Sequence, residues 1–488
     1  MTCTSKSGRG SRLAAALALG TVILLVAGWP PFIKDTITDQ GNESSRFAAI
    51  ESIVERHTTA IDDSVFFTVD KGYVNGHWYS DKPPLLTLAA AGVCAAAEKI
   101  FGWDFRRNRT ELIAFVNYVC HLFSVTVGTL AAFALLRRRA PEWDETATAF
   151  LATVPFFSTL AWSYSVTLGN HVPAAAVILL LAAELDHREM TPLRGLAAGL
   201  TAGLLLLIEY VPGAAFAWAL LLHLRLLRRD AAGTRTLLAA GAGIAAALVL
   251  LAVLNVLNHG SPLPLYVATH RPDLGKNLAF YAFHAIFGFE GLFLYTPALL
   301  GVPFLLRDPD ETLRNRLLLA AGATMLIYLV VTSDFGGWCY GFRFFVSVAP
   351  LLMLYLLLHF WRRRGWARMI FAAATLWGMV TALIGIYNPW TPGYEGSRTE
   401  YPVDFEVRSA LPANLLAWSY EYAPHSPLCR FLIEDFYGPE TALPYLYEVY
   451  ASTGKTAMRD RVKALAEKRL SAKPTPLFPE NDGETTEK

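Results

Sequence analysis

Residues 85–97, with the sequence LLTLAAAGVCAAA, decide the topology of this chain. The run is apolar, but a helix needs about 20 apolar residues to cross a membrane, and a shorter run more often lies at the interface. If this run crossed, Arg137, Arg138 and Arg139 would fall on the opposite side from the basic N-terminus. We therefore predict that residues 85–97 form a helix on the membrane surface.

The basic residues support this choice, because with it every basic cluster falls on one side of the membrane. Cytoplasmic loops carry an excess of lysine and arginine, which sets the orientation of a membrane protein. The clusters are Lys6, Arg9 and Arg12; residues 137–139; His187, Arg188 and Arg194; Arg225, Arg228, Arg229 and Arg235; Arg307, Arg314 and Arg316; and Arg362, Arg363, Arg364 and Arg368. The N-terminus is therefore predicted to be cytoplasmic.

The composition indicates an all-α polytopic protein of the cell (inner or plasma) membrane. Of the 488 residues 54% are apolar and 17% are charged, whereas soluble domains carry about 25% charged residues. About eleven transmembrane helices are expected, at 12–33, 112–136, 146–165, 172–186, 194–209, 211–227, 236–257, 291–306, 317–332, 345–361 and 369–388. The first run lacks a small-x-small cleavage motif after it, so we count it as a span rather than a signal peptide. A net charge of +1 indicates no nucleic-acid partner.

This topology divides the chain into a membrane core, 1–388, and an extracytoplasmic tail, 389–488. The first extracytoplasmic loop, 34–111, is too long to be a passive connection and is expected to carry function and juxtamembrane helices. In the tail, residues 456–470 are predicted to form an amphipathic helix. Roughly the last 17 residues, rich in Pro, Glu and Thr, are predicted to be disordered.

The first loop opens with two carboxylates, Asp39 and Glu43, at the entrance of a predicted amphipathic helix that includes residues 46–56. Phe47, Ile50 and Val54 recur at helical spacing there. Carboxylates at this depth lie close to whatever enters between the helices. The alternative for Glu43 is a first-turn acid that only stabilises the helix dipole.

A hairpin and a rigid turn follow in the same loop. Asn75-Gly76 between aromatic residues predicts a type I′ turn, with His77 directly after it. Asp81-Lys82 precedes Pro83-Pro84, whose fixed backbone sets where the two charged side chains point. A lysine held beside an acid at the membrane surface suits a phosphate group. An ordinary salt bridge at a turn is the simpler interpretation.

Two later loops add polar groups on the same side. Asn170 and His171 lie in the short loop 166–171, and Glu209 ends the fifth predicted span, where an acid must be paired or hydrated. In residues 333–344, three glycines allow tight turns around Trp338 and Tyr340 before Arg343. A fixed guanidinium can bind a phosphate through two hydrogen bonds. A basic side chain reaching lipid headgroups is the alternative for Arg343.

The order of these motifs resembles the GT-C superfamily of membrane glycosyltransferases, and most closely its protein O-mannosyltransferases and lipid A aminoarabinose transferase. The resemblance rests on Arg46-Phe47-Ala48 opening the surface helix, on the Gly-His-aromatic-Tyr hairpin and on Asp-Lys-Pro-Pro-Leu. It covers the chain to about residue 388 and leaves the tail uncovered. The loop before Arg343 is similar to a Gly-rich loop common in bacterial members.

The resemblance implies a polytopic GT-C fold and transfer of a sugar, with inversion, from a polyprenyl-phosphate donor to an extracytoplasmic glycolipid, glycan or protein. Glu43 takes the place of the family's catalytic aspartate, which leaves either Glu43 or Asp39 as the base. Lys82 matches the lysine that meets the donor phosphate, and Arg343 is expected to assist it. The expected cavity residues are Arg46, His77, Asp81, Asn170, His171, Glu209, Trp338 and Tyr340.

The resemblance implies no required cofactor, and it leaves a divalent metal open because related enzymes differ in their need for one. The loop with Asn170 and His171 contains no acid, which argues against a metal. The expected partners are the lipid-linked donor, the acceptor and membrane lipids. Two alternatives remain at this point. One is a transporter or flippase of lipid-linked sugars, which would need broken or charged helices at the midplane. The other is a GT-C relative without catalytic activity that binds its ligand only.

Overall fold

The structure is a computed structural model that describes residue 20, residue 37 and residues 41–187, 189–227, 230–269, 276–288, 290–307, 311–332, 339–391 and 410–470. The chain divides into two compact units, Met1–Val407 and Arg408–Lys488. Each unit is described by itself.

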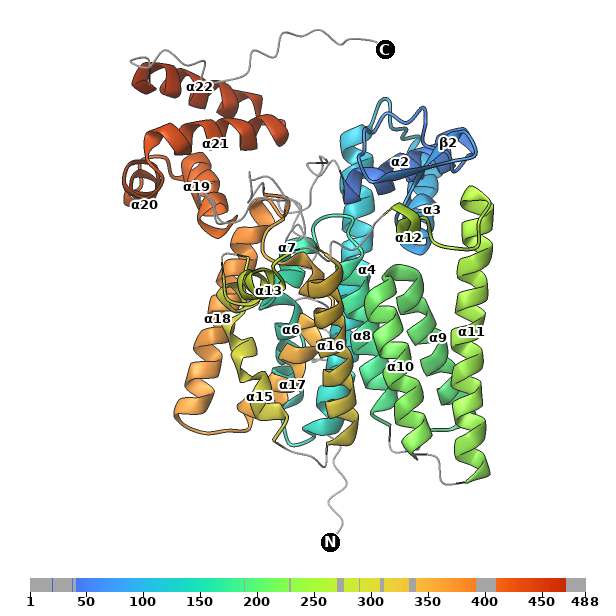
Figure 1. The fold of residues 1–488 in the computed structure, drawn as a ribbon. Helices are drawn as coiled ribbons and strands as arrows, with labels where there is room; N and C mark the ends of the chain where they lie inside the picture. Colours follow the sequence, from blue (N-terminus) through green and yellow to red (C-terminus); the bar gives the residue numbers. More distant parts are fainter. Residues whose placement is uncertain are drawn as a thin grey trace. The chain divides into compact units, whose positions relative to one another are not determined.

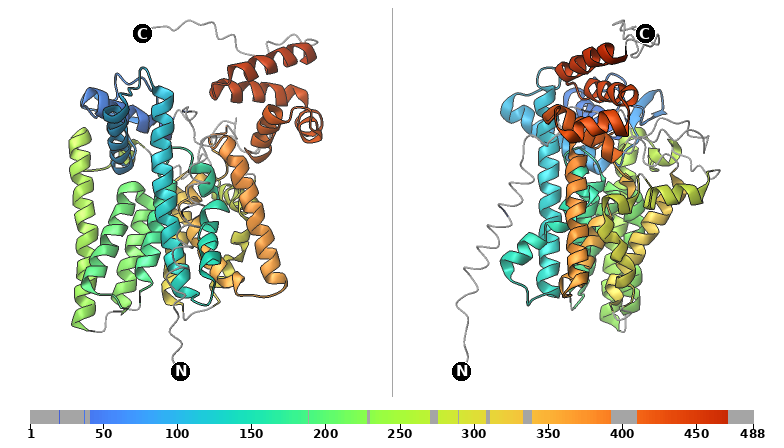
Figure 2. Two further views of the ribbon diagram at one scale, coloured as in Figure 1. Left: turned by 180° about the vertical axis from the view of Figure 1, so that it is seen from behind. Right: turned by 90° about the vertical axis from the view of Figure 1, so that its left-hand side faces the viewer.

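The first unit is a bundle of apolar helices that run alongside one another (Figure 1, Figure 2). Among the described residues, six helices are long and apolar enough to cross a membrane: α3 (Pro84–Phe101), α4 (Arg109–Arg139), α10 (Tyr210–Leu227), α11 (Ala231–His259), α16 (Thr312–Val331) and α18 (Trp366–Tyr387). Shorter apolar helices stand between them: α8 (His171–Leu185), α9 (Pro192–Ile208) and α17 (Ala349–Trp361). The prediction of an all-α polytopic membrane protein is confirmed. The first predicted span, 12–33, lies outside the described residues apart from Gly20.

Two predicted spans are broken into short helices. Residues 146–165 form α5 (Glu145–Leu151), α6 (Val154–Phe157) and α7 (Leu160–Tyr164), and residues 291–306 form α14 (Leu292–Tyr295), η2 (Pro297–Gly301) and α15 (Val302–Leu305). Pro155 removes a backbone donor. The Ser158 and Thr159 hydroxyls donate to the carbonyls of Val154 (2.6 Å) and Pro155 (2.9 Å). The Thr159 hydroxyl thus supplies the donor to the Pro155 carbonyl, because the Thr159 backbone N–H donates to Phe156 instead. The Val154 carbonyl also accepts the backbone N–H of Ser158 at 3.0 Å.

The first loop folds at one end of the bundle. It contains α2 (Asn42–Arg56) and an antiparallel hairpin of β1 (Lys71–Val74) and β2 (His77–Ser80). Asn75 and Gly76 both have positive φ, 51° and 89°, which confirms the predicted two-residue turn. Short connecting helices complete the first unit: α12 (Leu265–Thr269), α13 (Leu278–Ile286) and η3 (Arg343–Phe345).

Helix α3 is long enough to cross a membrane, but its contacts keep it at one end of the bundle. Leu85 at its start packs against Leu207 and Leu251, near the C-terminal ends of α9 and α11. Phe101 at its end packs edge-on against Phe115, in the second turn of α4, at 5.9 Å between ring centroids. The C-terminal end of α9 and the N-terminal end of α4 belong to the same end of the bundle, the end that carries α2 (Figure 1). Both ends of α3 therefore lie at this end, as the sequence predicted.

The second unit is a small helical domain. It contains α19 (Ala410–Tyr422), α20 (Pro427–Phe431), a π-helical turn η4 (Leu432–Phe436), α21 (Pro439–Ser452) and α22 (Thr456–Leu470). The Tyr450 hydroxyl donates to the carbonyl of Ala417 at 2.8 Å and ties α21 to α19. The amphipathic helix predicted at 456–470 is α22. The predicted disorder of the last residues concerns a segment outside the described residues.

Candidate functional site

The Glu43 carboxylate lies in the first turn of α2 and is fully buried. Three N–H groups donate to it: Asn117 Nδ2 at 3.4 Å, the backbone N of Leu168 at 3.2 Å and Trp390 Nε1 at 3.2 Å. These donors come from α4, from the loop before α8 and from the segment after α18. Hydrogen bonds from N–H groups stabilise the ionised form of a carboxylate. Glu43 therefore joins three distant parts of the chain.

Arg343 reaches the same Trp390 side chain from another direction. Its guanidinium carbon lies 5.4 Å from the Trp390 ring and 5.3 Å from the Phe344 ring, so both rings contribute cation–π attraction. Gly341, two residues earlier, has a φ of 71°, and an added Cβ would meet Leu160 at 2.7 Å. Only glycine fits this turn easily. The turn at Gly341 thus places Arg343 against the ring of Trp390, and the indole N–H of the same Trp390 donates to Glu43.

The Lys82 ammonium lies between two carboxylates. Its Nζ is 2.6 Å from Asp70 and 3.1 Å from Asp81, and its side chain is 8% exposed. The Tyr266 ring lies 5.6 Å away. Burial lowers the pKa of Lys82, but Asp81 and Asp70 outweigh it and raise the pKa above its ordinary value. Lys82 is therefore a fixed, permanently charged group.

A small apolar cavity adjoins Lys82. It has a volume of about 140 Å³ and is lined by Lys82 itself, by Thr87 and Leu88 of α3, and by Leu254 and Leu257 of α11. The lysine therefore stands where polar and apolar surfaces meet.

Arg46 connects α2 to the start of α3. Its side chain is fully buried, and its Nη1 donates to the Pro83 carbonyl at 3.3 Å and to the Thr87 hydroxyl at 3.4 Å. Burial lowers the pKa of the Arg46 guanidinium to about 10, while the charges of Asp81 and Glu209 act in the opposite direction. Arg46 thereby fixes the turn that carries Asp81 and Lys82.

His171 and Glu209 form a buried pair at the same end of the bundle. His171 Nδ1 lies 3.0 Å from Glu209 Oε1, and the Tyr328 hydroxyl donates to that oxygen at 2.5 Å. The His171 ring stands edge-on to Phe344 at 5.9 Å, next to Arg343 in sequence. The prediction that Glu209 must be paired is confirmed. Asn170 is buried and directly precedes α8.

The remaining predicted site residues lie elsewhere or outside the described part. His77 is mostly exposed and pairs with Asp62 at 3.1 Å on the hairpin. Tyr340 is fully buried, and its hydroxyl donates to the Thr381 carbonyl at 2.7 Å, a contact that holds the glycine loop against α18. Asp39 and Trp338 are outside the described residues.

The structure adds residues that sequence reasoning missed: Asp70, Asn117, Tyr266, Tyr328 and Trp390. Asp70 precedes the hairpin, and Trp390 follows the last span, but neither position forms a motif with its partner. Asn117 and Tyr328 stand in apolar helices, where a polar side chain is a weak sign of a buried network. Within the described part, no group of three His, Cys, Asp or Glu side chains could hold a metal ion.

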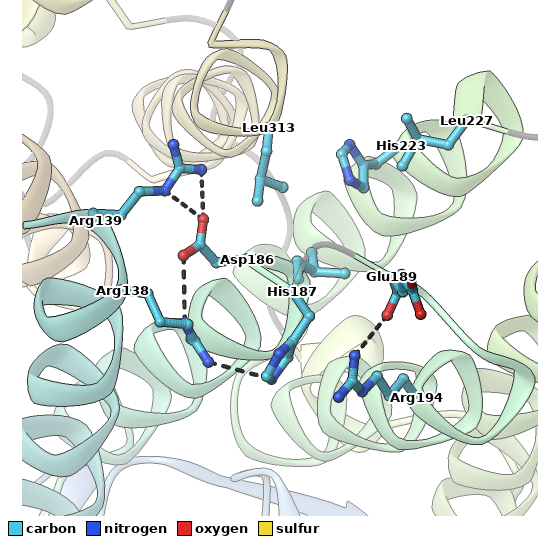
Figure 3. Close-up of a pocket in the computed structure, with 10 residues that line it drawn as sticks. Arg138, Arg139, Asp186, His187, Glu189, Arg194, His223, Leu227 and Leu313 are labelled. Atoms are coloured by element: carbon cyan, nitrogen blue, oxygen red, sulfur yellow. Dashed lines mark hydrogen bonds and ion pairs between the residues drawn. The ribbon is translucent and has the colours of Figure 1, made fainter. Parts of the chain in front are cut away.

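The opposite end of the bundle has a larger cavity of about 790 Å³ (Figure 3). Asp186 lies between the two arginines that end α4, 2.5 Å from Arg139 and 3.5 Å from Arg138. Arg139 also pairs with Glu311 at 2.8 Å. Arg138 and Arg139 therefore have carboxylate partners within the protein.

Comparison with solved structures places the fold. The crystal structure of ArnT from Cupriavidus metallidurans bound to undecaprenyl phosphate is similar over 92% of this chain and 74% of that chain, with a TM-score of 0.52 and 15% identity. The structure of the same protein in the apo state is similar over 93% and 76%, with a TM-score of 0.50 and 13% identity. No protein-family model matches the chain. No curated protein matches it either.

The fold is that of a polytopic membrane protein and is similar to the fold of ArnT, with buried polar groups gathered at the α2 end. ArnT is a lipid A aminoarabinose transferase, the branch that the motifs of the first loop resemble, and the resemblance is confirmed at the level of the fold. At this level of identity the similarity concerns the fold, and the chemistry must be argued from this chain's own residues.

Proposed function

We propose that this protein is a membrane glycosyltransferase that takes a hexose or pentose from a polyprenyl-phosphate donor and transfers it to a glycolipid, glycan or protein acceptor. The α2 end of the bundle faces the outside of the cell membrane, and the N-terminus faces the cytoplasm. The basic clusters support this orientation, since the helix ends that carry them in the described segments, such as the C-terminal end of α4 and the N-terminal end of α16, lie at the opposite end of the bundle (Figure 1).

The observation that carries the proposal is the setting of Lys82. This ammonium is held by Asp70 and Asp81, is nearly buried, and borders an apolar cavity with Leu254 and Leu257. A lipid phosphate needs this combination of a fixed cation and an adjoining apolar surface. The ArnT structure of the same fold was determined with undecaprenyl phosphate bound.

In the proposed reaction, an acceptor hydroxyl attacks the anomeric carbon, and the bond from that carbon to the phosphate oxygen breaks. The leaving lipid phosphate gains negative charge, which Lys82 and Arg343 stabilise. Both cations are fixed before the reaction begins, by carboxylates at Lys82 and by aromatic rings at Arg343. Attack from the side opposite the phosphate inverts the configuration at the anomeric carbon.

For the proton acceptor, the resemblance offers two carboxylates, Glu43 and Asp39. Glu43 is enclosed and accepts N–H groups from Asn117, Leu168 and Trp390. Such a carboxylate is a weak base, so these contacts favour a role for Glu43 in holding the site together. Asp39 remains the second carboxylate that the resemblance offers.

A transfer assay with purified protein in liposomes tests the proposal. Undecaprenyl-phosphate sugars with a labelled sugar are the donors, and an envelope glycolipid extract is the acceptor. We expect label in a new acceptor product together with release of undecaprenyl phosphate. Movement of the donor between leaflets without a new product would favour a flippase. Binding of undecaprenyl phosphate without either result would favour a relative that is not catalytic.

A further inference from the structure

His171 has one nitrogen engaged and one nitrogen available. Nδ1 faces Glu209 Oε1 at 3.0 Å. Because an ionised carboxylate only accepts hydrogen bonds, the hydrogen-bond network assigns the proton of the neutral ring to Nδ1. The lone pair is then on Nε2. Among the described residues, Nε2 has no hydrogen-bond partner, and neither has Glu209 Oε2.

Both side chains are deeply buried, with 5% of His171 and 3% of Glu209 exposed. A buried polar atom normally has a hydrogen-bond partner, so an unpartnered one requires an explanation. His121 and His259 also have buried nitrogens without partners in the described part, but no carboxylate holds either ring. His171 alone among these three combines a carboxylate on one nitrogen with a lone pair on the other.

The position of His171 links the other candidate groups. It begins α8, three residues after Leu168, whose backbone N–H donates to Glu43. Its ring contacts Phe344, which also lies under the Arg343 guanidinium. His171 therefore lies between the loop that Glu43 holds and the arginine assigned to the donor phosphate.

We propose that His171, oriented by Glu209, is the general base of the transfer reaction, a role that rests on the function proposed above. Nε2 takes the proton of the acceptor hydroxyl while the oxygen forms its bond to the anomeric carbon. The electron pair of the breaking carbon–oxygen bond leaves with the lipid phosphate. His171 becomes an imidazolium beside Glu209, and the proton is later released to water.

The surrounding charges suit this cycle. Glu209 opposes the positive charge that His171 gains, and the Tyr328 hydroxyl holds the same oxygen in place from α16. Arg343 of η3, on the far side of Phe344, and Arg46 of α2, which acts on Glu209, carry positive charge. A histidine with a carboxylate on Nδ1 is the arrangement by which enzymes hold an imidazole in the base tautomer.

The test measures transfer by His171→Gln, Glu209→Gln and Asp39→Asn as a function of pH. We expect H171Q to lower kcat by about 100-fold or more, the usual contribution of a general base, with the KM for the donor nearly unchanged. A general base must be unprotonated to act, so the pH profile of wild-type activity should have an acid limb, and this limb should be absent in H171Q. E209Q should lower kcat by about 10- to 100-fold, as loss of an orienting partner does.

His223→Gln is the matched control, because His223 is also buried but accepts a hydrogen bond from Arg316 at the opposite end of the bundle. It should transfer like wild type. Binding of undecaprenyl phosphate by each variant shows whether the site is still folded. The proposal is overturned if H171Q keeps both its kcat and the acid limb, or if D39N removes that limb instead. A wild-type protein that transfers no sugar overturns the proposed function, and this inference with it.

Discussion

The two ends of the bundle both carry buried or half-buried charges, but they satisfy them differently. At the end shown in Figure 3, Arg138 and Arg139 share Asp186, and Arg139 also has Glu311. At the α2 end, the pair of His171 and Glu209 leaves one nitrogen and one oxygen without partners in the described part. Arginines that end a helix and pair with carboxylates stabilise the helix end. Buried polar atoms without a hydrogen-bond partner indicate a site where a ligand can bind.

This contrast distinguishes charged residues that stabilise the fold from charged residues that bind a ligand. The sequence alone does not distinguish the two kinds. Both ends have basic residues next to acids. What distinguishes them is whether the protein completes each group's hydrogen bonds. Substitution of His171 or Glu209, whose open atoms lie at the α2 end, should therefore reduce transfer, and substitution of Asp186 at the other end should reduce stability alone.

The largest effect is expected from Lys82→Met, which keeps most of the side chain's volume and removes its charge. Without the cation, the leaving phosphate loses a preorganised partner, and kcat/KM should fall about 100- to 1,000-fold. Steady-state transfer from undecaprenyl-phosphate sugar measures this. Lys71→Met is the control, since Lys71 belongs to the same loop but stacks on Trp78 at 4.8 Å. A K82M protein that retains more than a tenth of wild-type activity would contradict the role of Lys82.

Glu43→Gln should affect stability first and activity second. Asn117 donates to one carboxylate oxygen and Trp390 to the other, so the NH2 that replaces either oxygen faces an N–H donor and at least one buried hydrogen bond is lost. We expect the free energy of unfolding to fall by about 1–3 kcal/mol. Denaturant titration in detergent measures this, with the exposed Glu111→Gln as the control. A fully stable E43Q protein without activity would instead support Glu43 as the base.

Asp186→Asn at the opposite end should lower the free energy of unfolding by about 1–2 kcal/mol, because two arginines lose their shared carboxylate. The effect is moderate since both arginine side chains are 31% exposed and water partly screens them. Transfer per folded molecule should stay at the wild-type level. Loss of transfer by stable D186N protein would show that the two ends are coupled.

The smallest effect concerns pH. Asp81 and Asp70 raise the pKa of Lys82 above 10.5, against the effect of burial. The attraction between Lys82 and a phosphate is therefore fully present below that value and is lost only as pH rises through the raised pKa. Binding of undecaprenyl phosphate should stay constant from about pH 7 to 9, above the phosphate's second ionisation near 6. A marked decline in that window would mean that Lys82 is not the phosphate's cation.

Local features were predictable where neighbouring residues define them. Asn75-Gly76 predicted its turn, the alternation of charge and alanine predicted α22, and the lysine beside two prolines predicted a rigid charged turn. The breaks in the spans at 146–165 and 291–306 were not predicted. The mean hydropathy of a segment hardly changes with the few proline and hydroxyl side chains that cause such breaks.

The sequence by itself determined the membrane class, the end of the bundle that carries the first loop, and the residue types of the site. Apolar length, the distribution of arginine and turn residues are local properties, and each acts through its near neighbours. Only the tertiary structure decided which polar groups meet. Glu43 contacts Trp390 across 347 positions, and His171 contacts Glu209 across 38. Such pairs depend on how the apolar helices pack. The sequence of an apolar helix does not indicate which other helices it packs against.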